Sequence, residues 1–193
     1  LTLELLEEGD TFWQQDESIL ARYQGKTKEM ELADLTRLED GLSPDEGMTH
    51  MVFRLETSGK ADWFNGHAPP DTLSPMVLEY FIQHTHEQYR KVVGEDFGTT
   101  VKGVFTDEPS VNDRHASFGE NKAWIPWTHG FREFFIERRG YDPFDTLPYL
   151  YFNTPESAAI RHDYWWTLTQ RFTEVFSGAL GAWCKEQGIA YTG

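Results

Sequence analysis

Apolar residues in the N-terminal part of the chain form short runs that polar turns separate. Two such runs lie at residues 1–6 and 18–24, and apolar and polar side chains alternate over residues 49–56. Alternation with a period of two is typical of a strand that buries one face. A turn with two glycines and a proline, at residues 41–47, precedes the alternating segment. The pattern predicts a small β-rich segment at residues 1–47, which either leads into the main domain or is an insertion within it.

A helical spacing of apolar residues dominates the remaining sequence. A Ser-Pro pair at residues 74–75 predicts a helix start, because the serine oxygen can accept from a first-turn amide and proline suits the first helical position. Apolar residues then recur at helical spacing until Gly94 ends the run. The same spacing predicts helices over residues 128–139 and 160–187, each followed by glycine.

Short strands are predicted between and after these helices, at residues 101–106 and 188–193. The alternating order is typical of a parallel sheet with right-handed crossovers. We therefore expect an α/β fold in which residues 48–193 form the N-terminal part of a (β/α)8 barrel of the TIM type. The chain has 193 residues, fewer than the ~250 of a closed eight-stranded barrel. We accordingly expect a partial barrel and a sequence that belongs to a longer protein.

The strand at residues 101–106 ends abruptly in Asp107, Glu108 and Pro109. Because Pro109 cannot donate a hydrogen bond to a sheet, it directs the chain into a loop. Carboxylates at the C-terminal end of a barrel strand face the substrate, so Asp107 and Glu108 are candidate catalytic residues. The alternative is a carboxylate pair that caps the loop or the following helix.

Hydrolysis of a glycosidic bond needs one carboxylic acid for the leaving oxygen and a second carboxylate as nucleophile or base. Glu108 suits the acid role, because it has the longer reach and partial burial would favour its protonated form. Adjacent strand positions point to opposite faces, so Asp107 would instead orient a sugar hydroxyl or a neighbouring side chain. The sequence does not decide which residue is the opposing carboxylate. It can lie on a strand beyond the given sequence, or it can be one of three loop residues: Asp62, Asp71 and Asp113.

Aromatic residues are abundant, with seven Trp, eight Tyr and fourteen Phe. Aromatic rings stack on sugars and also fill protein cores. Residues 60–71 form an irregular, Pro-containing loop that is a candidate binding loop. The candidate sugar-binding residues are side chains of predicted loops and helix starts that can stack or hydrogen-bond: Trp63, Asn65, His67, Asp71, Asn112, Trp124 and Trp127. The alternatives are packing roles for the tryptophans and turn roles for the polar residues.

Charge and composition exclude several functions. The 32 acidic and 17 basic residues give a formal net charge of -15, which disfavours nucleic acid and anionic membranes as partners. No apolar stretch reaches the ~18 residues of a membrane span. The single cysteine, Cys184, excludes a disulfide within the chain and is expected to be a buried thiol. Phosphate-binding glycine loops, serine-nucleophile elbows and zinc-type spacings are absent. The sequence does not decide the cellular compartment, and secretion and a periplasmic location are among the alternatives.

Short motifs follow one another over residues 48–193. They are Asp71-Thr72-Leu73-Ser74-Pro75, Phe81-Ile82-x-x-Thr85-His86-Glu87-x-Tyr89, Gly103-Val104-Phe105-Thr106-Asp107-Glu108-Pro109, Pro126-Trp127-Thr128 with Phe131, Arg139-Gly140-Tyr141-Asp142, and Arg161-x-Asp163-Tyr164-Trp165. Together they resemble the catalytic barrel of bacterial glycoside hydrolases of the α-L-rhamnosidase type, family 106 and its relatives.

This resemblance implies a carbohydrate substrate, such as an α-L-rhamnoside, and an inverting reaction with Glu108 as the catalytic acid. It implies that the second catalytic carboxylate follows on a later strand, so we expect the given chain alone to be inactive. It also allows a calcium ion near the sugar, for which Asp71 and Asp107 offer hard oxygen ligands. A carbohydrate-binding or interaction domain without catalysis is the alternative function.

Overall fold

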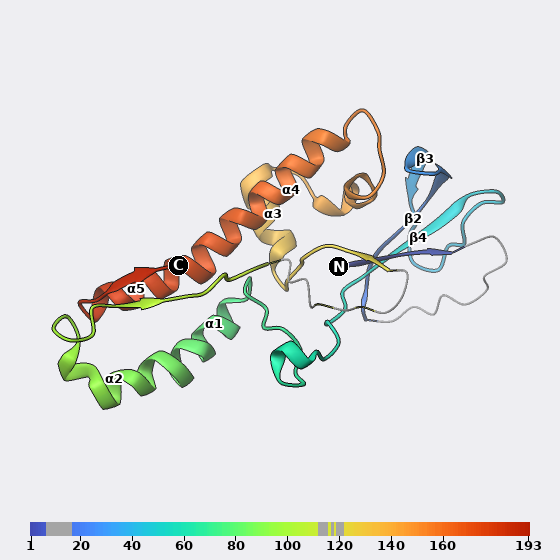
Figure 1. The fold of residues 1–193 in the computed structure, drawn as a ribbon. Helices are drawn as coiled ribbons and strands as arrows, with labels where there is room; N and C mark the ends of the chain where they lie inside the picture. Colours follow the sequence, from blue (N-terminus) through green and yellow to red (C-terminus); the bar gives the residue numbers. More distant parts are fainter. Residues whose placement is uncertain (7–16, 112–115, 117, 119–121) are drawn as a thin grey trace. The chain divides into compact units, whose positions relative to one another are not determined.

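The computed structural model describes residues 1–6, 17–111, 116, 118 and 122–193, and Figure 1 shows their path. The chain divides into two compact units. Unit 1 consists of Leu1–Pro69 and His115–Thr167, and unit 2 consists of Pro70–Arg114 and Leu168–Gly193.

Unit 1 is built on a five-stranded sheet with the order β3-β2-β4-β1-β6. Its strands are β1 (Thr2–Leu6), β2 (Ile19–Lys28), β3 (Glu31–Arg37), β4 (Thr49–Arg54) and β6 (Ala123–Trp124). Every neighbouring pair in this order is antiparallel. The central strand β4 has strands on both sides, and its four middle residues are all buried.

The core of unit 1 lies between this sheet and short helices. Buried residues of the sheet, among them Tyr23, Met51 and Phe53, pack with Phe144 and Leu147. The latter two belong to the 3-10 helices η4 (Pro143–Asp145) and η5 (Leu147–Leu150). Helix α3 (Phe131–Arg139) adds three buried phenylalanines, and α4 (Ser157–Phe172) begins in this unit.

Unit 2 consists of two helical stretches and one pair of strands. The first stretch contains α1 (Pro75–Phe81), the π-helix η2 (Ile82–His86), α2 (Glu87–Val93) and the 3-10 helix η3 (Gly94–Asp96). The second continues from the end of α4 through the π-helix η6 (Thr173–Gly178) into α5 (Ala179–Glu186). The strands β5 (Gly103–Phe105) and β7 (Ala190–Thr192) pair in parallel.

Among the described residues, an apolar cluster packs against one face of the β5-β7 pair. Val104 and Tyr191 pack against buried Trp183, Cys184 and Ile189. Cys184 is fully buried, which confirms the prediction of a buried thiol. The alternate positions of both strands are exposed, including Phe105 at 68%.

The predicted partial (β/α)8 barrel is wrong. The larger sheet is antiparallel, the described strands close no barrel, and β5 pairs only with β7 among them. The order of helices and strands suggested a continuous parallel sheet, but such an order does not determine which strands pair. Here the N-terminal strands pair antiparallel with one another and with β6, so a parallel arrangement is confined to one pair of short strands.

The predicted helices are present near their expected positions, with a π-helical segment inside each of the two stretches of unit 2. Helix α3 begins three residues after the expected start, behind Gly130 in a left-handed conformation, φ 75°. In the described part of the chain, no helix is both long enough and apolar enough to cross a lipid bilayer.

Candidate functional site

The predicted catalytic pair directly follows β5 in unit 2. The backbone N–H of Thr106 donates to the carbonyl of Thr192 at 3.0 Å, so the pairing with β7 continues to the residue before the pair. The side chains of Asp107 and Glu108 are exposed, so the partial burial expected for Glu108 is not observed. Among the described residues, neither carboxylate has a hydrogen-bond or ion-pair partner. Both are therefore accessible to a ligand.

Glu108 has an unusual backbone conformation, with φ 41°. A left-handed conformation outside glycine costs on the order of 1 kcal/mol or more, and such strain concentrates at functional sites. The other described non-glycine residues with positive φ are Glu29, between β2 and β3, Asn65, at the end of a 3-10 helix, and Asp34, within β3. Glu29 and Asn65 lie in turns, and Asp34 lies where the pairing of β2 with β3 shifts register, which are positions where this conformation is common. Glu108 lies outside any assigned turn or helix.

A second loop of unit 2 is joined to the segment that follows Glu108. The Thr72 hydroxyl donates to the carbonyl of Ser110 at 3.1 Å. In the same loop, the Asp71 Oδ1 accepts from the Leu73 N–H at 3.0 Å, and the Asp71 carbonyl accepts from the Ser74 N–H at 3.2 Å. Asp71 thus shapes the turn before α1 and uses one carboxylate oxygen to do so.

Three candidate sugar-binding residues share one loop of unit 1. Trp63 lies in the 3-10 helix η1 (Asp62–Phe64) and is 66% exposed. Asn65 ends this helix in a left-handed conformation, φ 53°, and its N–H donates to the Asp62 carbonyl. The His67 carbonyl accepts from the Ala61 N–H at 3.1 Å, which closes the loop. Asn65 therefore has the turn role considered as its alternative, while Trp63 is presented to solvent.

Trp127 packs inside unit 1. It is partly buried, and its ring lies 4.9 Å from that of Phe131, 6.0 Å from that of Phe144 and 6.4 Å from that of Tyr164, measured between centroids. This is the packing role considered as the alternative for the tryptophans. Trp124 lies on β6, with its ring 4.9 Å from that of Phe118.

Unit 2 thus brings together the loops of Asp71 and Glu108, whereas Trp63, Asn65, His67 and Trp127 belong to unit 1. Asp62 is exposed and also belongs to unit 1. Two predicted residues, Asn112 and Asp113, lie outside the described residues.

The calcium ion that the resemblance allows stays a prediction. Within the part of the chain that the structure describes, no three or more His, Cys, Asp or Glu side chains are arranged to hold a metal. Asp71 already uses one oxygen in its turn.

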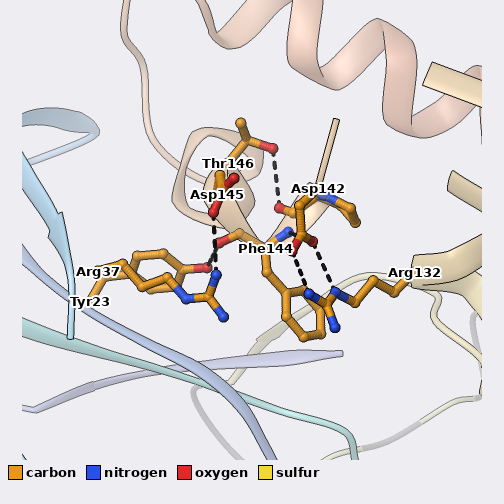
Figure 2. A network of polar contacts seen from close by, with 8 residues as sticks. Tyr23, Arg37, Arg132, Asp142, Phe144, Asp145 and Thr146 are labelled. Carbon is orange, nitrogen blue, oxygen red and sulfur yellow. Dashed lines mark hydrogen bonds and ion pairs between the residues drawn. The ribbon is translucent and has the colours of Figure 1, made fainter. Parts of the chain in front are cut away.

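A polar network in unit 1, drawn in Figure 2, explains another of the sequence motifs. The Arg132 guanidinium donates to both carboxylate oxygens of Asp142, and Asp142 Oδ1 also accepts from the Phe144 N–H at 3.0 Å. The hydrogen bond from Arg132 is the main cause that lowers the pKa of Asp142. Arg132 also lies over the Phe144 ring, 4.6 Å from its centroid, and the Tyr23 hydroxyl donates to the Phe144 carbonyl.

Neighbouring motif residues extend this bonding to α4. Arg139 Nε donates to the Thr167 hydroxyl at 2.7 Å, and the Tyr141 hydroxyl donates to Asp163 Oδ2 at 3.1 Å. Burial, followed by the nearby Asp163 carboxylate, raises the pKa of Tyr141 to about 12. These side chains hold α3, η4 and α4 together. The motif at residues 139–142 therefore has a structural role, which its charged and aromatic composition did not reveal.

The chain matches no protein-family model, no curated protein and no solved structure. The resemblance to family 106 glycoside hydrolases accordingly stays a prediction from the motifs.

Proposed function

We propose that this protein is a glycoside hydrolase with Glu108 as its general acid. The observation that carries the proposal is the state of Glu108: an exposed carboxyl group without a partner among the described residues, held in a left-handed backbone conformation at the C-terminal end of a parallel strand. A carboxyl group without structural bonds is available to a substrate. The strained backbone of Glu108 is not explained by a hydrogen bond or ion pair of its side chain among the described residues, and such strain indicates a functional constraint.

The proposed reaction has two carboxyl groups with separate tasks. Glu108 gives its proton to the glycosidic oxygen as the bond from that oxygen to the anomeric carbon breaks. Water attacks the anomeric carbon, and the second carboxylate takes a proton from this water. The products are a free alcohol and a reducing sugar. Asp71 is the candidate for the second group whose loop is hydrogen-bonded to the Glu108 segment.

The first test is Glu108→Gln in the longest available form of the protein, since the resemblance implies that the given chain alone is inactive. The change keeps the size of the side chain but removes its acidic proton. General acid catalysis contributes roughly 10²–10⁴-fold, so we expect a loss of this size in kcat for an aryl glycoside with a poor leaving group. An activated dinitrophenyl glycoside needs little protonation and should lose far less. α-L-Rhamnosides are the first substrates to test. Equal activity of both proteins on the poor leaving group would disprove the role of Glu108.

Asp107→Asn is the matched control, since it changes the adjacent exposed carboxylate in the same way. Asp107 is proposed to orient a sugar hydroxyl, so this change should raise KM or lower kcat without regard to the leaving group. Asp71→Asn should impair both substrates to a similar degree if Asp71 activates water. If the loss of kcat depended on the leaving group in Asp107→Asn and not in Glu108→Gln, Asp107 would be the acid in place of Glu108.

A second candidate function is sugar binding without catalysis, which the exposed ring of Trp63 favours. Its loop is closed by backbone hydrogen bonds, such as that from the Ala61 N–H to the His67 carbonyl. Binding of monosaccharides or oligosaccharides can be followed by tryptophan fluorescence and on a glycan array. Binding that Trp63→Ala removes and Glu108→Gln preserves, with no turnover of any aryl glycoside, would favour this function over hydrolysis.

A further inference from the structure

Unit 2 contains a groove with a volume of about 600 Å³, and the predicted sugar-binding residues are not among the residues that line it. One wall consists of residues of the first helical stretch, and the other of residues where η6 continues into α5. The lining residues are Pro75, Leu78, Glu79, Ile82, Gln83, Glu87, Glu174, Val175 and Ala179. Ligand pockets in proteins commonly span about 300–1,000 Å³, so the groove is large enough for several side chains of a partner.

The floor of the groove is apolar. Leu78 and Val175 are buried at 3% and 8% exposure and belong to one hydrophobic cluster, against which Ile82 and Ala179 pack. Ile82 and Ala179 are only partly buried, so they leave apolar surface of the groove in contact with water, and burying that surface would favour association at about 25 cal/mol per Å².

The groove also carries acidic side chains. Glu79, Glu87 and Glu174 all line it, and the described lining residues include neither lysine nor arginine. Glu87 is fixed, because it accepts from Trp183 Nε1 at 2.7 Å and pairs with Arg90 at 2.7 Å. The bond from Trp183 and then that from Arg90 lower the pKa of Glu87 and keep it ionised. The groove therefore combines an apolar floor with a negative potential.

Both walls contain a π-helical segment. Ile82 and Gln83 belong to η2, and Glu174 and Val175 belong to η6. Insertions of this kind are rare within α-helices and occur frequently at functional sites. Two of them on opposite walls of one groove distinguish it from an ordinary furrow between packed helices.

We propose that this groove binds a cationic amphipathic helix of a partner protein. An amphipathic helix in a groove places apolar residues at i, i+3, i+4 and i+7 on the floor, and its flanking lysines or arginines meet the acidic side chains. The net charge of -15 adds long-range attraction for such a partner. This interaction is independent of the proposed hydrolysis.

The first test measures the binding of a designed peptide to the full 193-residue chain by fluorescence anisotropy. The probe is a fluorescein-labelled peptide of about four turns with leucines at helical spacing and lysines elsewhere. The same peptide with glutamate in place of lysine is its charge control. The variant Glu79→Lys/Glu174→Lys should weaken binding at least about tenfold, because two attractive pairs become repulsive. The matched variant Glu95→Lys/Glu186→Lys makes the same change of charge at exposed positions outside the groove.

A loss of affinity that is equal in the two double variants would mean that the peptide responds only to net charge, and this result would overturn the proposal. The apolar floor needs a separate test. Ala179→Met should fill part of the groove and weaken binding, while Ala182→Met places the same side chain on the exposed face of α5 and should not. Circular dichroism confirms that each variant is folded. Unchanged affinity of the folded Ala179→Met protein would also overturn the proposal.

Discussion

Two charged segments of this protein differ in what their carboxylates do. At the turn of unit 1, Asp142 accepts hydrogen bonds from Arg132 and from the Phe144 N–H, and the surrounding backbone is ordinary. At the end of β5 in unit 2, Glu108 has no partner among the described residues and holds φ 41°. The first carboxylate stabilises the fold, whereas the second costs stability and is available for chemistry.

The difference shows how a charged motif can be assigned a role. Both segments belong to motifs that resemble a glycosidase, and both contain a carboxylate followed by proline, Asp142-Pro143 and Glu108-Pro109. A carboxylate whose hydrogen-bonding capacity is filled within the protein is worth most to folding. A carboxylate without such bonds, on a strained backbone, is the stronger candidate for a functional residue.

The largest expected effect comes from Asp142→Ala. This change removes a helix cap, worth about 1 kcal/mol, and a bidentate pair with a half-exposed arginine, worth roughly another 1 kcal/mol. We expect the free energy of unfolding in urea to fall by about 2 kcal/mol, with kcat on an aryl glycoside unchanged in the folded protein. Asp107→Ala is the control and should stay within about 0.5 kcal/mol of the original protein. Equal losses in the two variants would remove the distinction between the segments.

A smaller effect is expected from His50, another partnered group of unit 1. His50 is buried on β4, and its Nε2 accepts from Arg22 Nε at 3.2 Å. Burial first, and then the Arg22 charge, lower the pKa of His50 to about 4. Because the unfolded chain binds a proton near pH 6.5, this group contributes its full stability above that pH and loses it as the pH falls toward 4.

We therefore expect the free energy of unfolding to fall by roughly 1–2 kcal/mol between pH 7 and pH 4.5 on account of His50. His50→Gln keeps a hydrogen-bond acceptor but does not titrate, so its decline over this range should be smaller by that amount. The lowered pKa of Asp142 acts in a lower range, as the pH falls below the ordinary aspartate pKa of 3.8. Parallel decline of both proteins would show that His50 is not held neutral in the fold.

The sequence predicted local elements better than their pairing. The helix start at Ser74 is observed, and the side chain of Ser74 accepts from the Val77 N–H. Strand β3 was missed, because its seven residues alternate only weakly between exposed and partly buried positions. The antiparallel pairing of β1 with β4 and β6 joins residues some 50 and 120 positions apart. Pairing at such distances is decided by tertiary contacts, which a local pattern does not contain.

For the candidate site, too, the sequence predicted local features better than tertiary contacts. Proline and the preceding apolar run predicted a strand at residues 101–106, just before Asp107 and Glu108, and β5 ends one residue earlier, at Phe105. The burial of Glu108 was predicted wrongly, because that prediction assumed a continuous parallel sheet around β5. The packing of Trp127 against Phe131, Phe144 and Tyr164 depends on residues up to 37 positions away, so no local signal separated it from exposed Trp63.

The smallest expected effect concerns the backbone of Glu108. Unit 1 ends α3 with Gly140 at φ 80°, a conformation that glycine adopts without strain, whereas unit 2 has glutamate at φ 41°. Glu108→Gly should relieve this strain, and the greater freedom of glycine in the unfolded chain offsets part of the gain. We expect a net rise of about 0.5 kcal/mol in the free energy of unfolding, together with the loss of activity expected from Glu108→Gln. Glu108→Ala removes the same carboxylate but keeps the Cβ atom, so it should not become more stable. If glycine and alanine have the same stability, Glu108 is not strained, and the contrast with Gly140 fails.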